Sequence, residues 1–215
     1  MAERRYAYLH GFASSPNTKK GLHLADVFAK KGLLLERPEL NRPSFEKLSP
    51  AAMLAAVDAL DASASADAAK PWCFIGSSMG GWLAARWAEL HPERVERLVL
   101  LCPGFDLATR WLSIVGTEGM EKWRADGSLL FPDGAGVLRR VHWGFYEEGS
   151  KLPGRPEVPC PTRIYHGTDL KPGATFHGPA IIEETTTSVV VAPGDVCSVD
   201  AFTNYVIRTE ESSQS

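Results

Sequence analysis

The sequence has no cluster of basic residues, no long hydrophobic run and few cysteines or methionines. Its formal net charge is only −3, so nothing in its charge indicates a polyanionic partner such as nucleic acid. No apolar stretch reaches the roughly 18 residues that a membrane-spanning helix needs. Residues 1–12 lack the apolar core of a signal peptide. We therefore expect a cytoplasmic protein that binds neither nucleic acid nor a membrane.

The four cysteines are scattered along the chain and form no C-x-x-C pair. They are Cys73, Cys102, Cys160 and Cys197. This spacing is typical of reduced thiols and gives no support for a zinc site, so we expect neither a metal nor a cofactor. An apolar content of 44% in 215 residues suits one globular domain with a sizeable core, with or without a small addition.

Hydrophobic periodicity predicts strands that alternate with helices over most of the chain. The expected strands are residues 6–9, 33–35, 72–75, 97–102 and 162–165, and the expected helices are residues 18–31, 50–61 and 82–90. Such alternation requires crossover connections between strands, and these produce a mainly parallel sheet with flanking helices. The sequence thus predicts an α/β fold.

Two parts of the sequence depart from this alternation. Residues 105–160 are rich in glycine, proline and aromatic residues, which indicates an inserted cap over the carboxyl edge of the sheet. After about residue 170, short β-type runs separated by turn formers are typical of a small β-rich unit. These runs are residues 180–182, 188–191, 196–199 and 205–207. We therefore expect a core at 1–168, a β-rich segment at 169–210 and a disordered tail at 211–215.

The stretch Gly76-Ser77-Ser78-Met79-Gly80 matches G-x-S-x-G, the pattern of a serine nucleophile on a sharp strand-to-helix turn. Its context supports this interpretation, because a strand is expected before the motif and a helix after it. The two glycines allow strand and helix to pass closely around a serine in strained backbone. The alternative is a glycine-rich turn with an incidental serine. We expect Ser78 to be a nucleophile.

A second motif, His10-Gly11-Phe12, directly follows the first expected strand. In such a fold this loop can direct a backbone N–H towards the carbonyl oxygen under attack, and the residue after the nucleophile supplies the other donor. We therefore expect Phe12 and Met79 to form an oxyanion hole. His10 precedes the nucleophile, whereas the catalytic histidine follows it in this fold, so we interpret His10 as a turn residue.

Four stretches together resemble small α/β-hydrolase esterases of the YqiA-like branch. They are YLHGFASSPNTKKG at 8–21, IGSSMGGW at 75–82, RLVLLCPGFDLATRW at 97–111 and PTRIYHGT at 161–168. The resemblance covers about residues 5–168, and this branch is similar to acyl-thioesterase and acyl-glucuronide-esterase relatives. It implies an α/β-hydrolase fold and a serine hydrolase that acts on esters or thioesters of small or acyl substrates.

The resemblance ends near residues 168–170. The acid motif of that family, H-G-x-x-D, is one residue short here, and the expected helix, strand and C-terminal histidine are absent. Residues 169–210 instead resemble the C-terminal end of hydantoinase A and 5-oxoprolinase-type subunits, with their L-x-P-G, G-P-A-I-I-E-E and V-x-P-G runs. The chain therefore has the character of a chimera, and its C-terminal part by itself implies no activity.

Only His177 follows a candidate acid in the usual order of nucleophile, acid and histidine. Asp169 is the acid favoured by position, and Asp106, just beyond the strand at 97–102, is the alternative. The segment from Asp169 to His177 can span about 26 Å, but it is too short for a helix and a strand. The remaining histidines are interpreted as structural or, for His142, as a packing or substrate-contact residue.

The sequence favours a serine esterase or thioesterase that forms an acyl-enzyme on Ser78, with the cap aromatics around an apolar acyl pocket. Its partner is then a small ester or thioester substrate. A second hypothesis is an α/β-hydrolase scaffold that lacks its catalytic histidine and serves as a binding or assembly module. A third is a subunit fragment of a hydantoinase-type complex. An exposed sheet edge left by a missing final strand favours a homo-oligomer.

Overall fold

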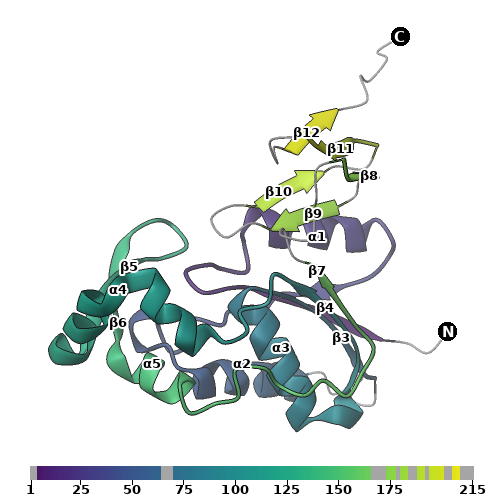
Figure 1. The fold of residues 1–215 in the computed structure, drawn as a ribbon. Helices are drawn as coiled ribbons and strands as arrows, with labels where there is room; N and C mark the ends of the chain where they lie inside the picture. The colour runs from purple at the N-terminus through teal and green to yellow at the C-terminus, as the bar shows by residue number, and fades with distance from the viewer. Residues whose placement is uncertain are drawn as a thin grey trace. The chain divides into compact units, whose positions relative to one another are not determined.

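A computed structural model describes residues 4–63, 70–165, 173–177, 180–183, 188–191, 194–200 and 205–208. The chain divides into two compact units, Met1–Arg163 and Ile164–Ser215, and each is described by itself (Figure 1). The expected boundary near residue 168 and the expected tail at 211–215 lie outside the described residues. Within the described ranges, no helix is both long enough and apolar enough to cross a bilayer.

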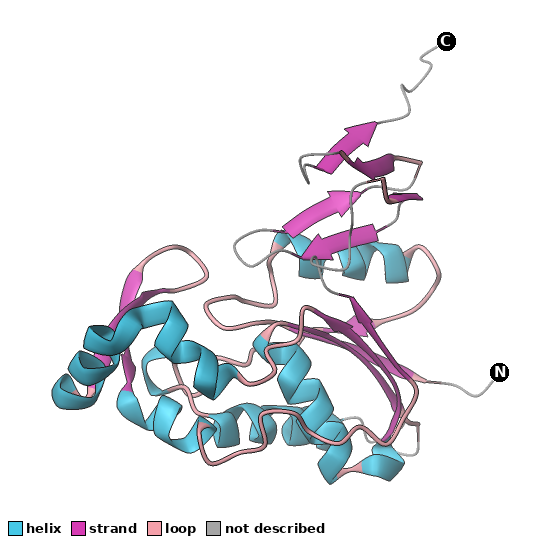
Figure 2. Cartoon of the chain, in the orientation of Figure 1, coloured by secondary structure: helices cyan, strands magenta, loops and turns pink. Residues whose placement is uncertain are grey.

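The central sheet has five strands in the order β2-β1-β3-β4-β7. These strands are β1 (Arg5–Leu9), β2 (Leu35–Glu36), β3 (Trp72–Ser77), β4 (Val95–Leu101) and β7 (Thr162–Tyr165). β2 and β3 both pair in parallel with β1, and β4 pairs in parallel with β3. This arrangement confirms the mainly parallel sheet that the sequence predicts, and Figure 2 shows the helices that flank it.

Three helices flank the sheet, α1 (Lys19–Ala29), α2 (Pro50–Ser63) and α3 (Met79–Leu90). α1 lies on one face, and α2 and α3 lie on the other (Figure 1). α1 begins after Thr18, whose hydroxyl accepts a hydrogen bond from the Gly21 N–H, and α2 begins with Pro50, which suits a first helical turn. α3 begins earlier than the sequence predicts. Its first turn contains Gly80 and Gly81, and because glycine is a weak helix former, the sequence does not indicate a helix there.

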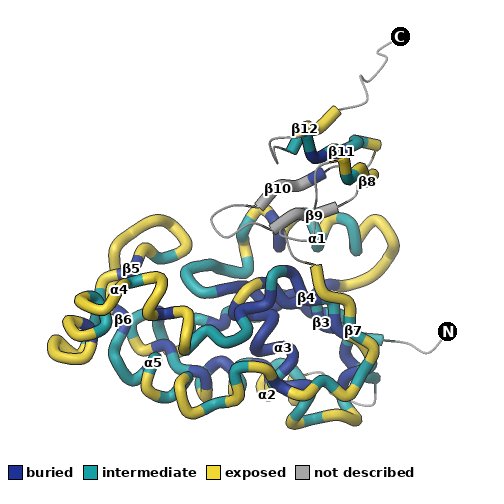
Figure 3. The backbone as a smooth tube through the Cα atoms, viewed as in Figure 1, coloured by how far each residue is buried: buried dark blue, intermediate teal, exposed yellow. Residues whose placement is uncertain are grey.

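The core of this unit lies between α3 and the strands β1, β3 and β4, where Figure 3 shows the deepest burial. Trp72 stacks on Phe74 with ring centroids 5.4 Å apart, and Phe74 meets Trp87 edge-on at 5.5 Å. These contacts fix β3 against α3, and the turn that joins them carries Ser78.

Two short 3-10 helices, η1 (Phe45–Lys47) and η2 (Pro92–Arg94), precede α2 and β4.

Residues 105–160 form the insertion that the sequence indicates, between β4 and β7. They contain α4 (Leu107–Asp126), an antiparallel hairpin of β5 (Ser128–Pro132) and β6 (Leu138–His142), and α5 (Trp143–Gly149). Trp111, Trp123 and Phe131 pack edge to face with centroids 5.2–5.3 Å apart. The aromatic composition indicates a cap but does not predict α4, because Gly116 interrupts the helical pattern with a kink at φ 74°.

The described residues of the second unit form short strands, as expected, and these strands pair in antiparallel fashion. They are β8 (Thr175–His177), β9 (Ala180–Glu183), β10 (Ser188–Val191), β11 (Val196–Val199) and β12 (Tyr205–Arg208). β9 pairs with β10, whereas β11 pairs with both β8 and β12. The sequence does not predict β8, since its three residues are too few to show a period.

Candidate active site

Ser78 lies in the turn between β3 and α3, at the carboxyl end of a central strand. Its backbone has φ 51° and ψ −120°, a region that residues other than glycine rarely adopt, and the residue is exposed. Two backbone hydrogen bonds tie the turn to residues 101–104. The Ser78 N–H donates to the Leu101 oxygen at 2.9 Å, and the Gly104 N–H donates to the Ser78 oxygen at 2.7 Å. The last residue of β4 and the segment that follows it therefore stabilise the strained conformation.

Two glycines make this turn sterically possible. A Cβ atom at Gly76 would lie 2.5 Å from the Gly80 oxygen, and one at Gly80 would lie 2.1 Å from the Leu9 oxygen. Both distances are far below van der Waals contact, so β1, β3 and α3 can approach each other only because these side chains are absent. The glycines of G-x-S-x-G thus serve the close packing that the sequence suggests.

The loop after β1 lies next to Ser78. A Cβ atom at Gly11 would lie 3.2 Å from the Ser78 Cβ and 3.8 Å from its Oγ. The Phe12 ring stacks on Phe145 at 5.6 Å and meets Trp111 edge-on at 5.3 Å, both in the cap. The loop is thus anchored on the cap side while its backbone stays close to the serine hydroxyl.

His10 holds this loop in place. Its side chain is 1% exposed, and both ring nitrogens contact the backbone. Nε2 accepts a hydrogen bond from the Leu40 N–H at 3.1 Å, which leaves Nδ1 as the donor to the Gly11 oxygen at 3.0 Å. Burial lowers the pKa of His10, against the opposing effects of its Gly11 contact and the Glu39 carboxylate. His10 is therefore a neutral structural imidazole, in agreement with its interpretation as a turn residue.

Two other histidines of the first unit, His91 and His142, are engaged away from Ser78. His142 Nε2 lies 2.8 Å from the Leu48 oxygen, and the His91 ring packs on Trp87 with centroids 4.4 Å apart. Over residues 4–63 and 70–163, the Ser78 hydroxyl makes no hydrogen bond to a histidine. The base that the sequence predicts for Ser78 lies in the remainder of the chain.

The expected triad partners lie in that remainder. His177 is the last residue of β8 in the second unit and is exposed, whereas Asp169 and His166 lie outside the described residues. The two units are each described by themselves, so the triad of Ser78, Asp169 and His177 stays a prediction.

Asp106, the alternative acid, directly precedes α4 and has a left-handed φ of 55°. Its carboxylate accepts a hydrogen bond from Arg155 Nε at 2.6 Å, and its N–H donates to the Gly154 oxygen at 3.0 Å. Asp106 thus links the two ends of the cap. Within the described chain its carboxylate pairs with a guanidinium and not with a histidine.

A buried lysine contacts Ser77, the residue before the candidate nucleophile. Lys20 of α1 is 8% exposed, and its Nζ donates to Ser77 Oγ at 3.0 Å. Burial lowers the pKa of Lys20 to about 8, with Cys102 opposing the shift. Burial also raises the pKa of Tyr8, against its hydrogen bonds to Ser77 and Thr18. Sequence reasoning misses this cluster, because a lysine in the first turn of an amphipathic helix is ordinarily solvated.

We expect the stability of the wild type to rise between about pH 8 and pH 10 relative to that of Lys20→Met. Below pH 8 the lysine is charged in both states, so the folded protein bears the full cost of burying the charge. Above it, the folded state releases a proton that the unfolded state keeps until near its ordinary pKa of about 10.4. The unfolding free energy of the wild type, relative to that of Lys20→Met, is expected to rise by up to about 3 kcal/mol.

Urea unfolding of both proteins between pH 7 and pH 10 measures this difference. Both proteins carry Cys102→Ser, because the Cys102 thiol interacts with the Lys20 charge. Tyr8 and the other thiols titrate in both proteins, so their effects cancel in the comparison. A difference in unfolding free energy that stays constant with pH would show that Lys20 keeps an ordinary pKa.

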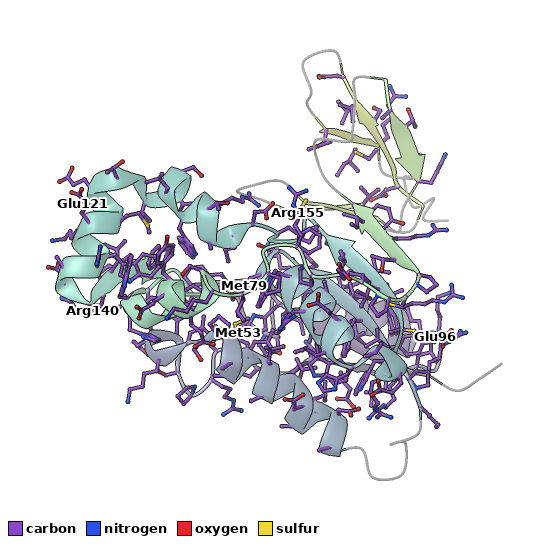
Figure 4. The ribbon with its side chains drawn as sticks, turned by 60° about the horizontal axis from the view of Figure 1, so that its bottom comes forward. Met53, Met79, Glu96, Glu121, Arg140 and Arg155 are labelled. Atoms are coloured by element: carbon purple, nitrogen blue, oxygen red, sulfur yellow. The ribbon has the colours of Figure 1, made fainter. Side chains whose placement is uncertain are left out.

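An apolar cavity of about 40 Å³ adjoins the start of α3. It is lined by Pro50, Met53, Met79, Trp82, Leu107, Ala108, Trp111, Phe145, Tyr146, Gly149, Pro153 and Gly154. Figure 4 shows two of these residues, Met53 and Met79, together in the interior of the first unit. No lining side chain is charged, and the described residues hold no group of three side chains suited to a metal ion.

The parallel sheet, the helices on both of its faces, and the strand-to-helix turn at Ser78 define an α/β-hydrolase fold. The chain is similar to a protein from Agrobacterium vitis S4 that is named as a candidate hydrolase (TM-score 0.62, 20% identity, covering 76% of this chain and 67% of that one). It is also similar to alpha/beta hydrolase domain-containing protein 10 from mouse (0.58, 22%, 77% and 69%) and to Est1E from Butyrivibrio proteoclasticus, solved with ferulic acid (0.62, 15%, 77% and 69%). Residues 5–130 match the uncharacterised protein family UPF0227, and the chain belongs to this family.

The C-terminal part is similar to a different family. Residues 160–209 match the hydantoinase/oxoprolinase C-terminal domain, so both resemblances indicated by the sequence are confirmed. A comparison with curated protein sequences finds no significant match. The chain thus joins a UPF0227 core to a terminal segment of another family.

Proposed function

We propose that the first unit is a serine hydrolase that cleaves carboxylic ester or thioester bonds of small or acyl substrates. The observation that carries this proposal is the placement of Ser78, exposed in strained backbone at the carboxyl end of β3. Strain of this kind is characteristic of functional residues. The loop at Gly11 and the apolar cavity at Met79 add the two features that acyl transfer requires, a source of N–H donors and a place for an apolar group.

In the proposed reaction, a base removes the Ser78 Oγ proton as Oγ attacks the carbonyl carbon. The N–H groups of Phe12 and Met79 stabilise the resulting oxyanion. The C–O or C–S bond then breaks, and the leaving alcohol or thiol takes the proton from the base. A water molecule attacks the acyl-enzyme in the same way, which releases the carboxylic acid and restores the Ser78 hydroxyl.

We assign the base role to His177 and the orienting role to Asp169. The assignment rests on the chain order of nucleophile, acid and histidine that this fold uses. It is also consistent with the engagement of His10, His91 and His142 in packing and backbone contacts away from Ser78. Asp106 remains the alternative acid.

One observation favours a second candidate function. Over the described part of the first unit, no histidine is bonded to Ser78, so the scaffold can have lost efficient catalysis and serve as a binding module. A serine enzyme without its base keeps only the residual catalysis supplied by the oxyanion hole and substrate binding.

Covalent labelling tests the proposal. We expect a fluorophosphonate to phosphonylate the native protein once, on Ser78, because an activated serine reacts far faster than an ordinary one. Mass spectrometry of the intact protein and its peptides locates the adduct. Ser78→Ala is expected to remain unlabelled, whereas Ser113→Ala, at an exposed position of α4, is expected to label like the wild type. Equal labelling of native and heat-denatured protein would favour the binding module.

A further inference from the structure

The proposed reaction leaves one buried cation, Lys20, without a role. Lys20 lies in the first turn of α1, and a Cβ atom at the next residue, Gly21, would lie 2.7 Å from the Pro16 oxygen and 3.2 Å from the Tyr8 ring. α1 can therefore approach β1 this closely only because residue 21 has no side chain. With the helix in this position, Lys20 is 8% exposed and reaches the end of β3.

Two buried side chains meet at the hydroxyl of Ser77, the last residue of β3. Lys20 Nζ donates to this hydroxyl at 3.0 Å, and the Tyr8 hydroxyl is also hydrogen-bonded to it. Ser77 itself is 4% exposed. An ammonium is costly to bury, and an apolar side chain of similar size would fill this space without that cost. The charge of Lys20 therefore points to a role other than packing.

This charge lies close to the atom that is proposed to react. Ser77 and Ser78 are consecutive, so standard covalent geometry places Lys20 Nζ within about 12 Å of Ser78 Oγ. At this distance and an effective dielectric constant of about 20, a unit positive charge favours a unit negative charge by roughly tenfold. Negative charge of this kind develops when Oγ attacks a carbonyl carbon.

We propose that Lys20 is a positioning residue for Ser78. Through Ser77, its ammonium holds the end of β3 from which the turn at Ser78 starts, and its positive charge stabilises the negative charge that forms there during the reaction. Because that negative charge exists only in the transition state, the interaction raises kcat and leaves KM unchanged. The proposal rests on the hydrolase function assigned to Ser78 and adds a residue that supports it.

The contribution of Lys20 is expected to depend on pH. Burial lowers the pKa of Lys20 to about 8, so its ammonium is present at pH 7 and lost by pH 9.5. The side chains that face it are Ser77 from β3, Tyr8 from β1 and Cys102 from the segment after β4. Burial raises the pKa of Tyr8, so this phenol stays neutral over the same range. The Cys102 charge acts on Lys20, and Cys102→Ser removes it.

Hydrolysis of p-nitrophenyl butyrate between pH 7 and pH 9.5 tests the proposal, with Cys102→Ser in every protein compared. At pH 7 we expect Lys20→Met to lower kcat by about tenfold with KM unchanged. The difference should vanish at pH 9.5, where the parent protein has lost the ammonium as well. Lys20→Arg keeps a charge and should abolish the decline of kcat above pH 8. Lys19→Met removes an exposed charge from the same turn and should match the parent at every pH.

The pH profile distinguishes this role from simple packing. A lysine that only fills space would give the same ratio of parent to Lys20→Met activity at every pH, and that result would show the proposal to be wrong. Because a buried arginine can prevent folding, circular dichroism must first show a native spectrum for Lys20→Arg. If it does not, the ratio for Lys20→Met decides alone.

A thiol probe separates this proposal from the function on which it rests. Ser78→Cys places a thiol at the position of the nucleophile, and the pH dependence of its alkylation by iodoacetamide, located by mass spectrometry, gives its pKa without any substrate. Lys20→Met, added to Ser78→Cys, is expected to raise this pKa by about one unit, whereas Lys19→Met leaves it unchanged. If the pKa rises while the wild type hydrolyses no ester, only the hydrolase function fails. If the pKa does not change, the role of Lys20 fails, whatever the activity.

Discussion

Ser78→Ala is expected to lower kcat/KM for p-nitrophenyl butyrate by roughly 10⁴ to 10⁶, the range found when a catalytic serine is removed. The reason is that alanine offers no nucleophile, so only uncatalysed attack by water within the oxyanion hole remains. His177→Ala should cause a fall of similar size, because a nucleophile and its base act as a unit. The double variant should then be no worse than either single one.

The controls distinguish loss of chemistry from loss of structure. Each variant must keep the wild-type unfolding midpoint, and Ser113→Ala should keep wild-type kcat/KM. If only Ser78→Ala loses activity, the base is not His177, and His166 and His142 become the next variants to test. If wild type does not exceed Ser78→Ala, the α/β-hydrolase fold stands and the proposed function does not.

Gly80→Ala is expected to destabilise the protein by at least about 4 kcal/mol, a loss seen only for severe defects. Its Cβ would lie 2.1 Å from the Leu9 oxygen and 2.5 Å from the His10 oxygen. Both atoms belong to the backbone of β1 and its following loop, so a side-chain rotation cannot relieve the contact. Since small domains are stable by only about 5–15 kcal/mol, the variant should be largely unfolded or insoluble.

Gly149→Ala is the matched control. A Cβ there would meet only the Pro50 Cγ, at an ordinary 3.8 Å, so the same substitution should change the unfolding free energy by less than about 1 kcal/mol. Urea unfolding followed by tryptophan fluorescence measures both variants. A loss below about 1 kcal/mol for Gly80→Ala would mean that α3 can move away from β1 at little cost.

Much of the fold follows from local pattern. The strands at 6–9, 72–75 and 162–165 are short apolar runs bounded by turn formers, and the structure contains them with small changes at their ends. The helical run of 82–90 is extended backwards to Met79, because tertiary packing overrides the poor helix propensity of Gly80 and Gly81. The sequence does not predict α4 at all, because Gly116 interrupts the hydrophobic periodicity of this long helix.

Some residues of the candidate site are likewise predictable from the sequence, and others are not. Ser78 and the loop at Gly11 are local motifs with recognisable neighbours, so sequence predicts both and the structure brings them together. Lys20 and Met53 carry no motif and become part of the site through helix packing alone. Asp106 forms an ion pair with Arg155, which is far away in the chain, and no sequence pattern indicates this contact.

The sequence by itself determined the family of the core, the junction with a hydantoinase-type segment and the identity of the candidate nucleophile. These depend on residues adjacent in the chain, whose backbone requirements are local. The tertiary structure decided what supports the motifs at that serine: a neutral His10 bonded to Leu40, a buried Lys20 bonded to Ser77 and a small apolar cavity lined by Met79. Burial and pKa shifts arise from residues far apart in sequence, so they exist only once the sheet, the helices and the cap have packed.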